Sequence, residues 1–260
     1  MKRFCIFMFS FCLLASLAAC GVQGFTPFSY ALEEQVYLDS DGAEDGTLVA
    51  EYRYSVPKMT ADGRLSKAQK ASLAAFNAEM DALVQNSLDY YASLKEAALA
   101  DYEYFKATGI PWDHYYADAL DYVEYRIGAS AISLLFDEYT DTGGAHPTSG
   151  VLCKLYDIEG EAWLTAEELT DDLAAFKAVI AENILHDIEA TERSEQYYDD
   201  YRTTVEALDG VEYYFTDGGV FIYFQDYTLG PHAVGIQEFY IPAEIFSPAL
   251  NERAHRVLGY

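Results

Sequence analysis

The chain has few cysteines, and most of them lie at one end. It holds 4 cysteines in 260 residues, and Cys5, Cys12 and Cys20 fall in the first twenty positions. Only Cys153 remains beyond them, so a domain that begins after residue 20 cannot form an internal disulfide. Its stability must come from a packed core. A hydrophobic content of 51% and an aromatic content of 15% are sufficient for one.

Basic residues are also scarce. The chain has 16 Lys and Arg against 43 Asp and Glu, and its formal net charge is −27. Such a field repels nucleic acid and anionic lipid headgroups and favours cations and basic proteins, although solubility alone is an alternative reason for it. The phosphate-binding patterns G-x-x-x-x-G-K-[ST] and G-x-G-x-x-G are both absent. We therefore expect no nucleic-acid partner and no cofactor.

Beyond the first twenty residues the sequence has no apolar run long enough to span a bilayer. Within them, Lys2 and Arg3 precede an apolar stretch that ends in "LAAC", which resembles a bacterial lipobox. This pattern predicts a lipoprotein signal peptide at 1–19, acyl chains such as palmitate on Cys20, and a tether at 20–30. The expected location is the extracytoplasmic side of the cell membrane. An ordinary secretory peptide or a short membrane helix is the alternative.

The rest of the sequence mixes strand and helix patterns. Apolar residues recur at steps of three and four over 65–107, which predicts a long helix that starts at Asp62 or Ser66 and packs on a sheet. Further helical patterns follow Thr165 and Glu168, which form a capping box. Strands are expected at 30–38, 47–56, 121–130, 132–140, 150–160 and 234–242, with a hairpin at 211–227.

These elements predict an α+β fold, an antiparallel sheet with a long helix and further helices packed on it. The domain is expected to span 31–250, with a division into 31–115 and 116–250 as the alternative. The pair Asp217-Gly218 is expected to form a type I′ turn in the hairpin. Cys153 alternates with Val151 and Leu155 and is expected to be a buried small hydrophobe.

Four segments resemble the extracytoplasmic domain of RsiV-type anti-sigma factors, which also precedes the catalytic domain of PdaC-type peptidoglycan deacetylases. The segments are "YRYSVPKMT", "AAFNAEM" with Asn77, "YTDTGGAHPTSGVLCKLYDIEGEAWLTAEELT" and "DGGVFIYFQDYTLGPHAVGIQEFYIPAEIF". The resemblance extends over residues 30–246 and implies binding of a lysozyme-like basic protein or a cell-wall glycan. The expected lipobox replaces the sigma-binding segment and the transmembrane helix of the anti-sigma factors, so sigma-factor sequestration is not expected. Deacetylation is not expected either, because the chain ends where the catalytic domain of the deacetylases would begin.

Two glycine-rich loops hold the candidate ligand-binding residues. In "EYTDTGGAHPTSG", Gly143 and Gly144 are expected to supply positive φ, and His146 either contacts a ligand or hydrogen-bonds the backbone. The second loop, "LGPHAVG", contains His232, and the two loops would form one rim if the fold brings them together. The candidate ligand-binding residues are Tyr139, Thr142, Gly143, Gly144, His146, Tyr227 and His232.

Metal chemistry is not expected. Glu182 and His186 lie four residues apart on a predicted helix, but two ligands are too few, and a solvated helix face explains the pair. The loop that starts at Asp39 faintly resembles a calcium loop, yet Ala50 occupies the position of the required glutamate. His114 lies in an unrelated sequence context.

We expect a lipid-anchored, noncatalytic binding protein of the cell envelope that recognises a basic protein such as lysozyme, or a wall component such as peptidoglycan. One alternative is an envelope hydrolase that uses His146 with a nearby acid such as Asp141, with Ser149 as a weak nucleophile candidate. Another is a structural accessory lipoprotein of an exported complex.

Overall fold

The computed structural model describes residues 7–9 and 28–260. Cys20 and most of the expected signal peptide and tether lie outside these residues. The described chain divides into two compact units that interleave in the sequence. Unit 1 contains residues 28–122 and 136–149, with 7–9, and unit 2 contains 123–135 and 150–260. Strands β4, β5 and β6 each contribute residues to both units.

The strands form two sheets. One sheet has the order β1 to β7, and the other has the order β10-β9-β8. The strands are β1 (Phe7–Phe9), β2 (Ala31–Gly42), β3 (Leu48–Thr60), β4 (Tyr116–Ile127), β5 (Ala131–Asp141), β6 (Thr148–Asp157), β7 (Ala162–Leu164), β8 (Glu212–Thr216), β9 (Gly219–Phe224) and β10 (Gln237–Pro242).

Five α-helices accompany these strands in the described residues: α1 (Lys67–Thr108), α2 (Leu173–Ala190), α3 (Tyr201–Ala207), α4 (Ala243–Phe246) and α5 (Glu252–Leu258). Short 3₁₀ turns lie at Ala166–Leu169, Ser194–Gln196 and Ser247–Ala249. The predicted α+β class is confirmed, including the long helix. The sequence patterns did not predict β7 or α5.

Unit 1 is built around α1. Ser66 caps the helix with a reciprocal capping box to Gln69, and Gly109 ends it in the left-handed conformation. The helix connects β3 to β4, and these two strands run parallel, as a helical crossover permits. On the other side β3 pairs antiparallel with β2, with Tyr37 opposite Tyr54.

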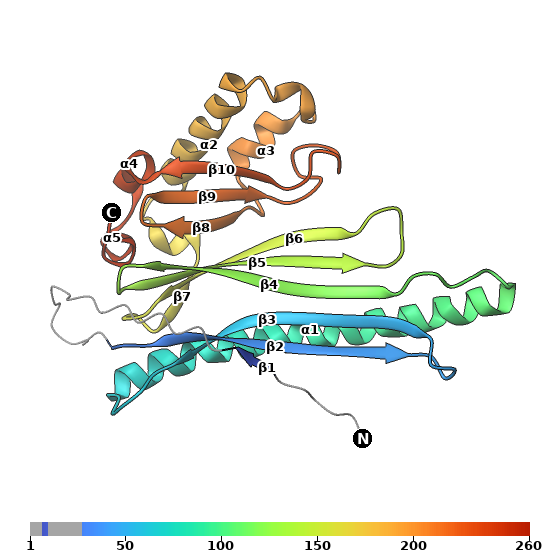
Figure 1. Cartoon of the computed structure of the whole chain (residues 1–260). Coiled ribbons are helices and arrows are strands. Elements are labelled where there is room, and N and C mark those ends of the chain that lie inside the picture. Colours follow the sequence, from blue (N-terminus) through green and yellow to red (C-terminus); the bar gives the residue numbers. More distant parts are fainter. Residues whose placement is uncertain (1–6, 10–27) are drawn as a thin grey trace. The chain divides into compact units, whose positions relative to one another are not determined.

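The core of unit 1 lies between α1 and one face of the sheet (Figure 1). Side chains alternate along β3, so Tyr52, Tyr54 and Val56 share this face and are at most 6% exposed. From the helix, Phe76 packs there with no exposed surface. The Asn77 side chain fastens the helix to the strand, because its amide accepts from Met59 N at 2.8 Å and donates to Met59 O at 2.9 Å.

In unit 2, α2 covers one face of the β8–β10 sheet. Phe176, Ile180 and Ile184 of the helix are fully buried with Ile222 and Phe224 of the sheet. The opposite face also has apolar neighbours. Tyr214, with Phe221 and Tyr223, packs against Leu135, Val151 and Cys153.

The hairpin of β8 and β9 is confirmed, with Thr216 paired to Gly219. The predicted type I′ turn is wrong, because neither Asp217 nor Gly218 has a positive φ. Close packing against backbone explains Gly219. A Cβ on Gly218 would lie 2.8 Å from the Tyr240 hydroxyl, and one on Gly219 would lie 2.2 Å from Ile241 O.

Candidate functional site

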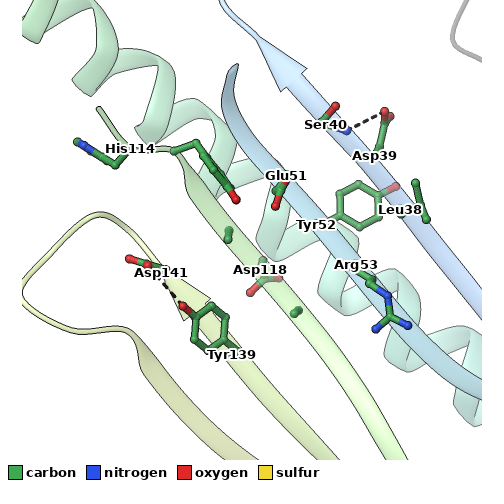
Figure 2. Close-up of a pocket in the computed structure, with 13 residues that line it drawn as sticks. Leu38, Asp39, Ser40, Glu51, Tyr52, Arg53, His114, Asp118, Tyr139 and Asp141 are labelled. Carbon is green, nitrogen blue, oxygen red and sulfur yellow. Dashed lines mark hydrogen bonds between the residues drawn. The ribbon is translucent and has the colours of Figure 1, made fainter. Parts of the chain in front are cut away.

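The face of the unit 1 sheet that points away from α1 carries an open groove of about 870 Å³. The Tyr54 hydroxyl donates to the backbone carbonyl of Ser87 in α1, so Tyr54 points toward the helix. Because side chains alternate along a strand, Glu51 and Arg53 of β3 point to the opposite face. Figure 2 shows the lining residues on β2, β3, β4 and β5, with α1 behind the sheet. They are Leu38, Asp39, Ser40, Glu51, Tyr52, Arg53, His114, Tyr115, Ala117, Asp118, Ala119, Tyr139 and Asp141.

Small side chains at the centre of β4 make this face hollow. Ala117 lies beside Glu51, and Ala119 lies beside Arg53, in the parallel register of β3 and β4. Their methyl groups leave space between the longer side chains of the lining. The groove therefore results from the choice of alanine at two alternate positions of one strand.

Two tyrosines stand in the groove, each beside a carboxylate. Tyr115 is 41% exposed and Tyr139 is 38% exposed. The hydrogen bond from Tyr115 to Glu51 is the main cause that raises the pKa of Tyr115, and nearby Tyr139 and Asp141 raise it further. The Tyr139 hydroxyl lies 3.4 Å from Asp141 Oδ2. Partial burial, and then the charge of Asp141, raise the pKa of Tyr139.

The charge of the lining is mainly negative. Glu51 and Asp141 contribute two carboxylates on the open face, whereas Arg53 is the one lysine or arginine in the lining. The Arg53 guanidinium forms ion pairs with Asp121 and, at 3.9 Å, with Glu34. Its charge is therefore balanced locally, and the groove keeps an excess of acidic groups.

Asp118 holds the sheet together below the groove. Its side chain lies on the α1 face, where Tyr54 Oη is 2.5 Å from Oδ2 and Thr140 donates to Oδ1 at 2.7 Å. Burial raises the pKa of Asp118, while the two hydrogen bonds act in the opposite direction. Asp118 is 7% exposed, so its role is to join β3, β4 and β5.

The loop that contains Gly143 packs on His114 at one end of the groove. Gly143 has φ 69°, as predicted, and a Cβ there would lie 2.2 Å from His114 Cδ2. Asp141 Oδ1 accepts from Gly143 N at 2.8 Å, which fixes the loop to the groove carboxylate. The His114 ring packs on Trp112 with the ring centroids 4.1 Å apart. No sequence pattern indicated this contact, because His114 and Gly143 are distant in the sequence and meet only in the folded sheet.

Of the candidates from the first loop, Tyr139 lines the groove. Thr142, Gly144 and His146 are exposed in the loop beyond it, and His146 Nδ1 lies 3.3 Å from Pro147 O. The predicted positive φ of Gly144 is wrong, because Gly143 alone makes this turn possible. The Asp141 carboxylate is engaged by Gly143 and Tyr139.

Tyr227 and His232 belong to unit 2, and the single rim that would join them to His146 stays a prediction. Tyr227 has φ 64°, which is strained for a tyrosine, and its ring stacks on that of His232 at 5.6 Å. His232 Nδ1 is hydrogen-bonded to the carboxylate of Asp226. The strain is therefore held by a compact loop between β9 and β10.

The other residues singled out in the sequence are Glu182, His186 and Cys153. Glu182 and His186 line a hollow of about 710 Å³ on α2 that also includes Lys177, and no cluster of three or more metal-ligating side chains occurs in residues 7–9 and 28–260. Cys153 is half-buried rather than buried, beside Tyr214, and its backbone N–H donates to Glu212 Oε2 at 2.7 Å. Among the described helices, none is long and apolar enough to cross a membrane.

One family model matches part of the chain. Residues 167–244, all in unit 2, match a family model described as DUF3298, a protein of unknown function. No curated protein matches the chain. The groove of unit 1 lies outside the matched residues.

Two solved structures share the fold. A DUF3298 family member from Bacteroides fragilis superposes with a TM-score of 0.62 at 15% identity, over 85% of this chain and 94% of that protein. A DUF3298 family protein from Pseudomonas aeruginosa gives a TM-score of 0.54 at 16% identity, over 88% and 97%. At these identities the similarity concerns the fold.

Proposed function

We propose that the protein is a binding protein of the cell envelope whose partner is a basic protein such as lysozyme. The observation that carries the proposal is the open groove of unit 1, which combines exposed tyrosines with an excess of carboxylates. Tyrosines of this kind are enriched at protein interfaces. The resemblance of the sequence to RsiV-type extracytoplasmic domains supports the same class of partner.

The charge of the whole chain supports the proposal independently. A net charge of −27 attracts cationic proteins over a distance and raises their association rate. This attraction is screened by salt, with a Debye length of about 10 Å at 0.1 M. Binding should therefore weaken clearly as the ionic strength rises.

Titration calorimetry with lysozyme, at about 30 mM and about 150 mM salt, tests the proposal. We expect saturable binding at the lower salt concentration and weaker binding at the higher one. Absence of binding at both concentrations, up to high micromolar protein, would reject lysozyme as the partner. A parallel incubation with muropeptides tests the alternatives, because retention without mass change would indicate a wall-binding protein and cleavage would indicate a hydrolase.

We further propose that acyl chains on Cys20 hold the protein on the extracytoplasmic face of the cell membrane. Two or three chains, at about 0.8 kcal/mol per buried CH₂, provide a stable anchor. Mass spectrometry of the mature amino terminus is the direct test. We expect an acylated Cys20, whereas an unmodified amino end or an uncleaved leader would refute this part of the proposal.

A further inference from the structure

We infer that the groove of unit 1 binds an arginine side chain, held in a cage formed by Glu51, Tyr115, Tyr139 and Asp141. The inference rests on the proposed function, because it names the chemical group by which a basic partner would be recognised. It adds a defined subsite to the general charge attraction. We call these four residues the tyrosine–carboxylate cage.

The four cage residues lie close together on one face of the sheet. Glu51 comes from β3, and Tyr139 and Asp141 come from β5 (Figure 2). Tyr115 immediately precedes β4. Glu51 accepts a hydrogen bond from Tyr115, and Tyr115 is near enough to Tyr139 and Asp141 to interact with their charges. The cage is therefore a single cluster, although its members are up to 90 positions apart in the sequence.

The shape of the groove suits a long side chain. Ala117 lies beside Glu51 in the register and provides a low floor between β3 and β5. A volume of about 870 Å³ exceeds that of one side chain, so the groove also has room for the neighbouring backbone of a partner. The tyrosine rings, 41% and 38% exposed, present apolar surface on which a flat cation can lie.

The chemistry favours arginine over other groups. A guanidinium is planar, forms forked hydrogen bonds with carboxylates and stacks on aromatic rings. The cage offers both kinds of contact, with carboxylates at Glu51 and Asp141 and rings at Tyr115 and Tyr139. Arg53, also in the lining, is already paired with Asp121 and Glu34 and leaves these carboxylates to a partner. An anionic ligand would be repelled by both carboxylates, and a neutral ligand could donate hydrogen bonds to them but would leave their charge unbalanced.

The first experiment uses a minimal probe, the peptide N-acetyl-Gly-Arg-Gly-amide, followed by NMR titration of the protein. The same peptide with citrulline in place of arginine is the neutral isostere. We expect weak, saturable shifts at Tyr115, Tyr139 and their neighbours with the arginine peptide and none with citrulline. Equal responses to both peptides, or equally tight binding of a lysine peptide, would overturn the arginine assignment.

Substitutions in the cage test the same inference. Glu51→Gln with Asp141→Asn removes both charges, and Asn at position 141 can still accept from Gly143 N, so the loop should keep its conformation. We expect about fivefold weaker binding of the arginine peptide. Glu96→Gln with Glu103→Gln, on exposed positions of α1, changes the net charge equally and should leave binding unchanged.

The rings have their own matched pair. Tyr139→Phe keeps a flat aromatic surface and should retain binding of the arginine peptide, whereas Tyr139→Leu should weaken it about two- to fivefold. Equal binding by the two variants would contradict a role for the ring. Circular dichroism of each variant checks that the fold is intact.

Lysozyme separates this inference from the proposed function. If the wild-type protein and the Glu51→Gln/Asp141→Asn variant bind lysozyme equally, the cage inference is wrong and the proposed function stands. If lysozyme does not bind but the arginine peptide is preferred over citrulline, the lysozyme partner is wrong and the cage inference stands.

Discussion

The two faces of the unit 1 sheet carry the same pair of side chains, tyrosine and carboxylate, in different surroundings. Under α1, Tyr54 is 1% exposed and contacts Asp118, and Tyr91 donates to Asp41 at 3.1 Å. On the open face, Tyr115 is hydrogen-bonded to Glu51 and the Tyr139 hydroxyl lies 3.4 Å from Asp141 Oδ2, but both tyrosines remain exposed. Burial makes the first set structural, because a buried polar group must keep its partner, and exposure leaves the second set available to a ligand.

The largest difference between the faces should appear on truncation of an aromatic ring. Phe76→Ala opens a cavity under α1, where Phe76 has no exposed surface, and should lower the free energy of unfolding by about 3–5 kcal/mol. Tyr104→Ala, on the same helix but 61% exposed, is the control and should change it by about 0.5 kcal/mol or less. Urea denaturation measures both, and similar losses would mean that burial is not the deciding factor.

The hydrogen bonds between Asn77 of α1 and the backbone of Met59 in β3 should have the second-largest effect on stability. Asn77→Ala leaves the N–H and C=O of Met59 without their side-chain partner, and Met59 is fully buried. We expect a loss of about 2–4 kcal/mol in the free energy of unfolding. Asn86→Ala, at an exposed position of the same helix, controls for helix propensity. If Asn77→Ala lowers the free energy of unfolding no more than Asn86→Ala does, the hydrogen bonds between Asn77 and Met59 contribute nothing to stability.

Removal of one hydroxyl from each face gives the closest comparison. Tyr54→Phe leaves the buried Asp118 with Thr140 as a donor but without Tyr54, and should cost about 1–3 kcal/mol. Tyr139→Phe removes an exposed hydroxyl 3.4 Å from Asp141 and should cost about 0.5 kcal/mol or less. Chemical denaturation of the two variants in parallel provides the measurement. Equal losses in the free energy of unfolding would show that the two hydroxyls contribute equally to stability, contrary to the distinction between the faces.

The smallest effect should be a change in pH dependence. Burial raises the pKa of Asp118 above its usual value of 3.8 in the folded state. Its contribution to stability is therefore complete below pH 3.8 and is lost as the pH rises through the raised pKa. Asp118→Asn should make the free energy of unfolding rise more steeply with pH just above 3.8. An unchanged slope would place the pKa of Asp118 at its usual value.

The sequence predicted the elements of unit 1 better than the site that they form. Ser66, the period of α1 and the α+β class follow from local patterns, and all three are confirmed. The cage forms because β3, β4 and β5 lie side by side. The periodicity of a strand sequence does not tell which strands pair, nor that β3 and β4 run parallel. Of its members only Tyr139 was a predicted ligand contact, with Asp141 noted as a nearby acid.

The turn chemistry shows the same limit. Gly143 was expected to need a positive φ, and it has one, but its contact with His114 depends on tertiary packing. Gly218 was expected to serve a type I′ turn but has no positive φ, and it is at the neighbouring Gly219 that the backbone carbonyl of Ile241 excludes a side chain. A glycine in a sequence therefore indicates a constrained position. It does not tell whether the constraint is a positive φ or the close approach of another group.

Hydroxyl-radical footprinting of the tyrosines, with and without lysozyme at low salt, tests the central claim most directly. Tyr115 and Tyr139 lie in the groove, while Tyr90 and Tyr104 are exposed on α1 at 52% and 61% and serve as internal controls. The account predicts that lysozyme protects Tyr115 and Tyr139 from oxidation and leaves Tyr90 and Tyr104 unchanged. Protection of the α1 tyrosines with none at Tyr115 and Tyr139 would contradict it.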